Sequence, residues 1–350
     1  MVVARVEERL VRAPPAGIPA AHPSFVNEAE ELVPRVALAE LPRGRVLGRY
    51  RAVITARGTL VGELSPYFSI RTPNEHPVFA DVFAPGPTVV PGRVGVLAAR
   101  GDVSYYHFMT DALPRLALLE QLKRPPEQLY VPASLPFQKQ LIDILGIPHE
   151  RLIDADRVPH LQAETLVVPG LPDADLKTPP WIVSFLRERL LPPGMSRVPG
   201  ERLYVTRGRQ RGNRIVSNEP AVIGALKPLG FKTIDTGGLP VSHQIKAFAQ
   251  AELIVAPHGG ALTNLAFASP GAAVIELFAS DWVQGCYWKL AACVPGLTYS
   301  YLVCGERRRG RAMHGVDSDI TVDIGELLAL LERLGQDAAD DPHGARATIR

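Results

Sequence analysis

A short apolar run that leads into His258, Gly259 and Gly260 constrains the fold of this chain more than any other feature. Residues 252–256 have the composition of a buried parallel strand and residues 260–268 the pattern of a short helix, so the glycines form a tight turn between them. Such a turn lets an anion approach the backbone, and the helix start adds unpaired N–H groups and a positive dipole end. The sequence therefore predicts a phosphate-binding turn, although it matches neither the G-x-G-x-x-G nor the Walker pattern.

The remainder of the second half alternates between strand-like and helix-like segments. Strands are expected at Arg202–Thr206, Phe231–Asp235, Glu252–Ala256, Ala273–Phe278 and Thr298–Val303. Helices are expected at Asn218–Leu229, Val241–Ala251, Gly260–Ala268 and Trp282–Ala292, with Gly230 at a C-cap position. This alternation predicts a doubly wound parallel sheet, in which ligands bind beyond the carboxyl ends of the strands.

The first half of the chain is less regular. Its predicted strands are Val94–Ala99, Gln128–Val131 and Thr165–Val168, and its predicted helices are Tyr105–Lys123 and Phe137–Leu145. We expect two Rossmann-like α/β lobes with a cleft between them. A first lobe over residues 1–170 is followed by a Pro- and Gly-containing linker at 171–180, a second lobe at 181–335 and a loose polar tail at 336–350.

Composition excludes several classes of protein. The chain has 350 residues, which is enough for two domains, and its net charge of +2 argues against nucleic-acid binding. No apolar run reaches the roughly 18 residues of a spanning helix, and Met1–Ala20 lacks the pattern of a signal peptide, so a cytoplasmic protein is expected. The cysteines form no C-x-x-C pair, so no zinc site is predicted.

Two residues of the glycine turn are candidate ligand contacts. His258 follows a strand end, where it would contact a phosphate or a sugar hydroxyl; the alternative is that it caps the turn. Asn264 lies on the same turn face, and it either bonds the ligand or ties down the loop.

A second candidate is the arginine-rich segment from Arg207 to Arg214, which follows another predicted strand. Arginine is suited to bidentate contacts with a diphosphate. The alternatives are a solvated basic loop and an RNA contact, and the absence of interleaved aromatic residues argues against RNA. Glu276 lies in a third strand of the same predicted sheet.

The third candidate combines His107, Asp111 and Arg115, whose spacing places them on one side of a helix. A histidine one turn from a carboxylate is either an oriented base or a polar group beside a carboxylate base. Pro114 removes a helical hydrogen bond and predicts a kink. The alternative is that Asp111 is only the N-cap of a helix that begins near Pro114.

Three Asp-x-Asp pairs are present, and such a pair can hold a divalent metal for sugar transfer. They are Asp154–Asp156, Asp173–Asp175 and Asp317–Asp319. Because pairs of this kind are common by chance, none is taken as a metal site.

Together, the three candidate segments resemble glycosyltransferase family 61, which includes bacterial capsular-polysaccharide transferases, plant xylan-decorating transferases and animal O-linked GlcNAc and O-mannose-extending transferases. The matching pieces are Tyr106-His107-Phe108 with Asp111 and Leu113-Pro114-Arg115, Leu203–Arg207 with Arg214–Glu219, and His258–Asn264 with Phe267, Pro270-Gly271 and Val274–Glu276. The likeness covers residues 100–280 and departs from the family at Gly260, where an Ala is usual.

The resemblance implies a GT-B fold and a metal-independent, inverting glycosyltransferase of polysaccharide biosynthesis. It implies a nucleotide-sugar donor, of UDP type, bound by the second lobe, a glycan or glycoconjugate acceptor bound by the first, and no further cofactor. Asp111 or His107 would be the catalytic base. The implied donor-binding residues are Arg207, Arg214, His258, Gly259, Gly260, Asn264 and, on the ribose, Glu276.

Other interpretations stay open at the level of sequence. One is a different Rossmann-like enzyme, such as an epimerase or phosphatase, that uses the same anion turn. Another is a non-catalytic nucleotide- or sugar-binding protein. The donor sugar, the acceptor, the oligomeric state and any peripheral association with a membrane are not determined by these patterns.

Overall fold

The computed structural model describes residues 2–68, 72–80, 85–171, 176–194, 200–208, 214–307 and 318–340. The chain divides into two compact units. Unit 1 contains Met1–Glu8 and Leu32–Leu190, and unit 2 contains Arg9–Glu31 and Leu191–Arg350. Within the described residues, no helix has both the length and the apolar character needed to cross a bilayer.

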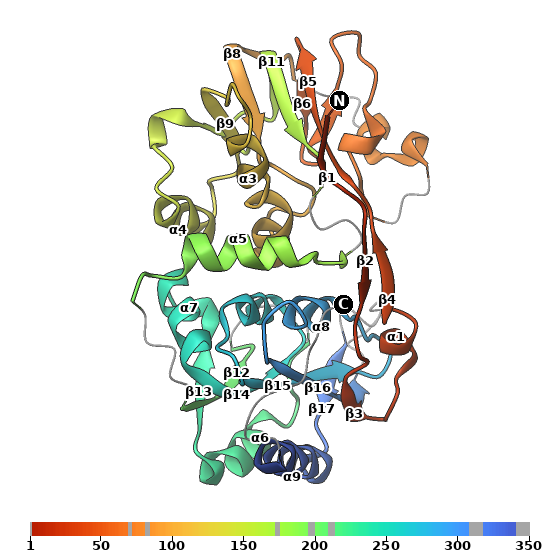
Figure 1. The fold of residues 1–350 in the computed structure, drawn as a ribbon, viewed down its shortest axis with the longest axis vertical. Coiled ribbons are helices and arrows are strands. Elements are labelled where there is room, and N and C mark those ends of the chain that lie inside the picture. The colour runs from red at the N-terminus through yellow and green to blue at the C-terminus, as the bar shows by residue number, and fades with distance from the viewer. Residues whose placement is uncertain are drawn as a thin grey trace. The chain divides into compact units, whose positions relative to one another are not determined.

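Unit 1 is built on a mixed sheet in the order β1-β5-β11-β8-β9-β10, in which β6 also pairs with β11 and β7 pairs with β6 (Figure 1). The strands are β1 Val2–Arg5, β5 Val36–Pro42, β6 Arg45–Leu47, β7 Ala52–Ile54, β8 Thr88–Val96, β9 Gln128–Val131, β10 Leu152–Asp154 and β11 His160–Pro169. β8 pairs in parallel with both β9 and β11. The chain winds from β8 through β9 to β10 and then returns to the other side of β8, so the winding reverses between β8 and β11. A ligand site is expected beyond the carboxyl ends of these two strands.

The helices of unit 1 are short. They are α2 Tyr105–His107, α3 Arg115–Glu120, α4 Pro136–Ile144 and α5 Pro180–Leu190, with a π-helical turn at Phe108–Ala112 between α2 and α3. One face of the sheet is covered by an apolar core that includes Val94, Val96, Tyr130 and Leu166. The predicted helical stretch Tyr105–Lys123 is helical as far as Glu120, but the π-turn and the turn at Leu113 and Pro114 divide it into α2 and α3.

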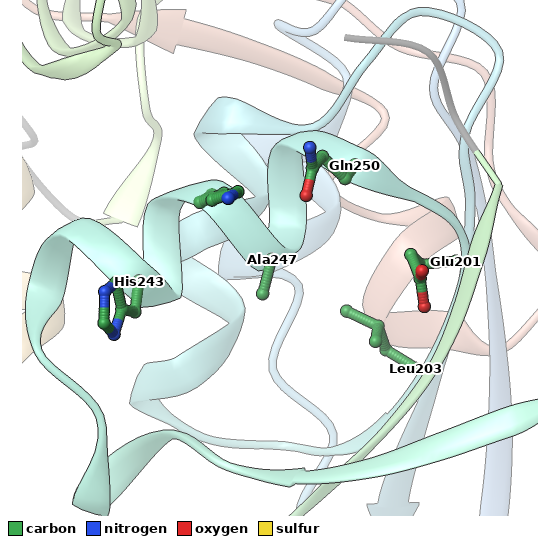
Figure 2. A pocket seen from close by; sticks show the side chains of 6 residues that line it. Glu201, Leu203, His243, Ala247 and Gln250 are labelled. Carbon is green, nitrogen blue, oxygen red and sulfur yellow. The ribbon is translucent and has the colours of Figure 1, made fainter. Parts of the chain in front are cut away.

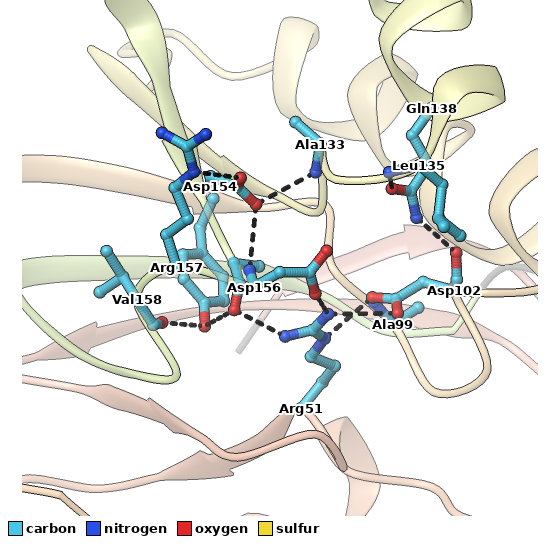
Figure 3. A network of polar contacts seen from close by, with 12 residues as sticks. Arg51, Ala99, Asp102, Ala133, Leu135, Gln138, Asp154, Asp156, Arg157 and Val158 are labelled. Carbon is cyan, nitrogen blue, oxygen red and sulfur yellow. Dashed lines mark hydrogen bonds and ion pairs between the residues drawn. The ribbon is translucent and has the colours of Figure 1, made fainter.

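An ionic network fixes the loop that follows β8. The guanidinium of Arg51 donates to Asp102 at 2.9 and 3.3 Å, to Asp156 at 2.6 Å and to the carbonyl of Ala155 at 2.9 Å (Figure 3). Gln138 on α4 donates to the backbone carbonyl of Asp102 at 2.9 Å. Burial raises the pKa of Asp102, and Arg51 opposes this shift. The network therefore anchors the loop that leads into α2.

Unit 2 is built on a second sheet in the order β13-β12-β14-β15-β16-β17, with β3 beside β16. The strands are β3 Ala16–Ile18, β12 Glu201–Thr206, β13 Phe231–Asp235, β14 Ala251–Pro257, β15 Ala273–Ala279, β16 Thr298–Arg307 and β17 Asp319–Thr321. The strands from β13 to β16 are parallel, and β17 is antiparallel. The winding of the chain reverses between β12 and β14, so a ligand site is expected beyond their carboxyl ends.

Helices cover both faces of this sheet. α6 Glu219–Leu226 and α9 Ile324–Asp340 lie on one face, and α7 Val241–Gln250 and α8 Cys286–Ala291 lie on the other (Figure 1). Val222 and Leu226 of α6 and four leucines of α9 pack against alternate strand residues such as Val255 and Ile275. The intervening strand residues, including Glu276, therefore face α7 and α8.

The five strands predicted for this half of the chain are confirmed within a few residues, and the α/β class is confirmed for both units. Gly230 ends the 3₁₀ turn after α6 with a φ of 83°, in the left-handed conformation expected of a C-cap glycine.

Two expectations for this half of the chain are corrected. Residues 260–267 form a 3₁₀ helix, and residues 336–340, predicted as part of a loose tail, continue α9. The alanines at 338 and 339 favour that continuation. The GT-B arrangement of the lobes stays a prediction.

The two units have different bounds from the predicted lobes. Residues 9–31 group with unit 2, and α5, predicted to open the second lobe, groups with unit 1. The predicted linker at 171–180 lies partly outside the described residues.

Residues 9–31 form a segment that completes unit 2. They contribute β3 to the sheet edge beside β16 and the single turn α1 Pro23–Val26. Phe25 of α1 is fully buried, with its ring 4.5 Å from the Tyr301 ring and 5.5 Å from that of Trp288. The buried ammonium of Lys289 on α8 pairs with Glu28 at 2.8 Å and with Glu31 at 2.7 Å. The buried Phe25 ring and the ion pairs of Lys289 thus bind the segment to the rest of unit 2.

We predict that Phe25→Ala lowers the free energy of unfolding of unit 2 by about 3–5 kcal/mol, because it removes a fully buried ring and leaves a cavity. Chemical denaturation followed by tryptophan fluorescence measures the change. The matched control is Val26→Ala, since Val26 is 46% exposed, and its effect should stay within about 0.5 kcal/mol. Equal effects of the two substitutions would contradict the role of Phe25 as an anchor.

Candidate functional site

In unit 2, two predicted site residues meet where the winding of the sheet reverses. Arg207 directly follows β12 and His258 directly follows β14, and these strands are parallel neighbours. The Nη1 atom of Arg207 donates to the backbone carbonyl of His258 at 3.1 Å. The guanidinium is thus attached to the glycine turn that the sequence singled out.

A buried carboxylate fixes the imidazole of His258. Its Nδ1 contacts Glu276 in the middle of β15, and the hydroxyl of Tyr299 on β16 donates to the second oxygen of Glu276. The strand register explains why these side chains meet. Ala256, two residues before His258, lies opposite Glu276, and Val274, two residues before Glu276, lies opposite Tyr299. Because side chains alternate along a strand, His258, Glu276 and Tyr299 lie on one face of the sheet. Burial lowers the pKa of His258, and the Glu276 carboxylate opposes this shift.

This geometry changes the interpretation of Glu276. The sequence suggested a contact with ribose hydroxyls, but the side chain is 0% exposed and both of its oxygens are engaged. Glu276 instead orients His258. Tyr299 was missed by sequence reasoning, because no motif accompanies it and only the strand register brings it to Glu276.

Aromatic rings surround His258 and reach the second predicted arginine. The His258 ring lies 4.8 Å from that of Trp282, 5.0 Å from that of Tyr287 and 5.3 Å from that of Phe278. The guanidinium of Arg214 lies over the Trp282 ring at 5.3 Å. Trp282 therefore links Arg214 to His258, a role that the sequence did not indicate.

The two arginines form a positive site. Among the residues that the structure describes, neither Arg207 nor Arg214 pairs with a carboxylate. Burial together with the charge of Arg214 lowers the pKa of Arg207 to about 10. Residues 209–213 of the predicted arginine-rich segment lie outside the described part of the chain. Two close guanidinium groups without a partner carboxylate are suited to an anion.

The glycine turn is shaped by its neighbours. A side chain at Gly259 would collide with Nη1 of Arg207, so glycine lets the guanidinium lie against the backbone. Gly260 begins the 3₁₀ helix. Asn264 is fully buried and donates to Gln244 at 3.2 Å and to the Ala261 carbonyl at 3.0 Å. Of its two interpretations, these contacts favour the one in which Asn264 ties down the loop.

In unit 1, the third predicted group lies in the π-turn. The Nδ1 atom of His107 is 2.8 Å from Oδ2 of Asp111, one turn further on. Pro114 has no N–H to bond the Thr110 carbonyl, and the preceding Leu113 N–H bonds the carbonyl of Phe108, five residues back, at 2.9 Å. At the kink predicted for Pro114 the structure has a π-turn, a feature frequent at functional sites.

The alternative in which Asp111 caps a helix is wrong. Pro114 occupies the N-cap of α3 without a side-chain cap bond, and Asp111 lies inside the π-turn with no solvent exposure. Arg115 is also buried and donates from Nη1 to the Ala98 carbonyl at 2.5 Å. Burial lowers the pKa of Arg115 to about 10, against the opposing effect of Asp111. Arg115 therefore attaches the π-turn to the loop after β8.

His107 is the member of this group that solvent reaches, because its side chain is 16% exposed whereas that of Asp111 is 0% exposed. Its ring lies 5.1 Å from the ring of Phe68. A Cβ at Gly101 would lie 2.9 Å from both rings, and Gly101 has a φ of +69°. Glycine is required there both by the conformation and by the close approach of the two rings.

Within the described residues, the Asp-x-Asp pairs do not form a metal site. Asp154 accepts from the backbone N–H groups of Ala133 and Asp156, and Asp156 pairs with Arg51. Asp173, Asp175 and Asp317 lie outside the described residues. Within the described ranges, no three His, Cys, Asp or Glu side chains gather as a metal site would require.

A cavity of about 300 Å³ lies elsewhere in unit 2, between the start of β12 and α7 (Figure 2). Its lining includes Glu201, the first residue of β12, and His243 and Gln250 of α7. It is therefore at the amino end of β12, away from the carboxyl end where Arg207 and His258 meet.

Comparison with known proteins identifies the family. No curated protein matches the chain. The family model described as Glycosyltransferase 61 matches residues 105–275, a stretch that begins with the turn carrying His107 and Asp111 and ends beside Glu276. This family implies glycosyltransferase activity, in general with a nucleotide-sugar donor and a glycan acceptor. The match supports the assignment of this stretch, residues 105–275, to the glycosyltransferase 61 family.

Proposed function

We propose that the protein transfers a sugar from a nucleoside-diphosphate sugar, of UDP type, to a hydroxyl of a glycan or glycoconjugate, with inversion and without a metal ion. The observation that carries the proposal is the site of Arg207, Arg214 and His258 in unit 2. A diphosphate needs compensating positive charge as it leaves the sugar, and guanidinium groups provide it in the bidentate geometry that phosphate oxygens favour.

The glycine turn supports the same assignment. At Gly259 the absence of a side chain leaves room for Nη1 of Arg207, which is fixed beside the turn by its bond to the His258 carbonyl. The turn leads into the first N–H groups of the 3₁₀ helix that begins at Gly260, a position suited to an anion. Glu276 and Tyr299 hold the His258 ring in one orientation. Asn264 keeps the loop in place. We assign donor binding to these residues, with Glu276 and Asn264 acting as positioning residues.

In unit 1 we assign the base to His107. Asp111 is fully buried, so an acceptor hydroxyl reaches the imidazole first. With Nδ1–H donated to the Asp111 carboxylate, the Nε2 atom carries the lone pair that accepts a proton. Within the described residues this Nε2 makes no hydrogen bond. A carboxylate in this position fixes the tautomer and stabilises the imidazolium that forms.

The reaction then has one displacement. His107 Nε2 takes the proton of the acceptor hydroxyl while that oxygen forms a bond to the anomeric carbon. The bond from the anomeric carbon to the diphosphate oxygen breaks, and its electron pair leaves with the diphosphate. Arg207, Arg214 and the N–H groups of the turn stabilise the departing charge.

We predict that Asp111→Asn and His107→Gln each lower kcat by about 100-fold or more, the scale of general-base catalysis. An amide at position 111 would donate to Nδ1 and place the proton on Nε2, which removes the base. Initial rates with one acceptor, together with UDP affinity, measure this. The matched control is His149→Gln, an exposed histidine that contacts Asp143 at 3.0 Å, and it should leave kcat unchanged. Retention of most of the kcat by His107→Gln, with a raised acceptor KM, would instead make Asp111 the base.

For the donor site, Arg207→Gln should weaken UDP binding by about 10- to 100-fold, because it removes a charge-assisted contact of about 1.5–3 kcal/mol. Titration calorimetry measures the dissociation constant. Arg202→Gln is the matched control, since Arg202 lies in the same strand, is 44% exposed and pairs with Glu252. An unchanged affinity in a folded Arg207→Gln protein would show that the diphosphate binds elsewhere.

Turnover should also survive a large excess of EDTA, since arginine and histidine rather than a cation neutralise the diphosphate in this proposal. The rate is compared before and after chelation at constant ionic strength. Complete loss of turnover that manganese or magnesium restores would contradict metal independence.

A further inference from the structure

Arg100 is a buried cation without a counter-ion in the described part of the chain. Four arginines there are less than a tenth exposed, namely Arg12, Arg51, Arg100 and Arg115. Arg12 pairs with Glu31, Arg51 with Asp102 and Asp156, and Arg115 bonds the Ala98 carbonyl. Arg100 makes neither a hydrogen bond nor an ion pair with any described residue, and its Nε is buried without a partner.

An unpaired buried guanidinium is costly to the fold. Burial removes its water, and arginine does not escape the cost by losing its proton at neutral pH. Nearby Arg115 adds repulsion, because the charge of Arg100 contributes to the lowered pKa of Arg115. A carboxylate or phosphate oxygen from a ligand would relieve both effects, and the planar fork of arginine matches such groups.

The position of Arg100 connects it to the proposed base. Its guanidinium lies over the ring of Phe68, 4.7 Å from the centroid, and the Phe68 ring lies 5.1 Å from the ring of His107. Phe68 is 40% exposed, so part of an aromatic surface is open beside both polar groups. The apolar C–H face of a pyranose ring packs well on such a surface. Gly101, between Arg100 and the loop to α2, lets the two rings approach the backbone.

We propose that Arg100 and Phe68 form an acceptor subsite for an anionic sugar, one that carries a carboxylate or a phosphate ester, beside His107. The subsite rests on the proposed function, because it treats the ligand at His107 as the acceptor. The anion contacts the Arg100 guanidinium, the sugar ring lies against Phe68, and the reacting hydroxyl faces His107.

The test measures sugar binding by ligand-detected NMR with UDP at saturation, so that the site of Arg207 and Arg214 is filled. The probes are the methyl glycosides of glucuronic, galacturonic and mannuronic acid, their neutral parent glycosides, and methyl glucoside 6-phosphate. At least one anionic probe should bind about tenfold more tightly than its parent, which corresponds to about 1.4 kcal/mol. A preference among the uronides alone identifies a carboxylate acceptor, and a preference for the phosphate alone identifies a phosphorylated one.

Three variants test the role of Arg100. Arg100→Gln should abolish the preference and leave binding of the neutral sugar within about twofold, whereas Arg57→Gln, at an exposed arginine of the same unit, should retain the preference. Arg100→Met should keep or raise the unfolding midpoint, because it removes an unpaired buried charge, whereas a structural arginine would lower it. Equal binding of every anionic probe and its parent, or a preference that survives Arg100→Gln, would overturn the subsite.

The outcomes separate this inference from the proposed function. If UDP binds through Arg207 and neutral sugars are glycosylated without any anionic preference, the subsite is wrong and the transferase assignment stands. If UDP does not bind but the preference still depends on Arg100, the donor site is wrong and the anion subsite remains.

Discussion

The contact between the His258 imidazole and the buried Glu276 carboxylate fixes the candidate donor site, and the nearby residues of unit 2 are arranged around it. The carboxylate also accepts a hydrogen bond from Tyr299, so residues of two neighbouring strands, β15 and β16, fix the group that holds the ring, and the Trp282 ring packs against the imidazole. The carbonyl of His258 then receives Arg207. Glu276 therefore positions Arg207 through His258, without a direct contact between the carboxylate and the guanidinium.

Unit 1 follows the same topological rule with different chemistry. Its polar residues also come after a parallel strand at a reversal of winding, and the loop is anchored by Arg51 through Asp102. Pro114 then imposes the π-turn in which Asp111 lies directly behind His107. One unit thus presents a histidine with a lone pair for a proton, and the other presents guanidinium groups for an anion.

The sequence was sufficient where a local pattern determines the structure. Buried apolar runs predict the strands of unit 2, and Arg207 and His258, which follow two of them, are placed in one predicted ligand site because parallel strands share a carboxyl edge. The sequence was insufficient where strand register, or packing between segments far apart in the chain, determines the structure. Tyr299 reaches Glu276 only through strand pairing. The segment 9–31 joins unit 2 through long-range contacts such as that of Phe25, which no periodicity reveals.

The account depends on a single displacement by one base, and the anomeric configuration of the product tests that claim most directly. An α-linked UDP-sugar is supplied with an acceptor, and the proton coupling at the new anomeric centre is followed by NMR from the first turnover. One displacement predicts a β-linkage in the first product formed. An α-linkage in that product would require two displacements or a front-face route, and would contradict the assignment of His107 as the base that activates the acceptor.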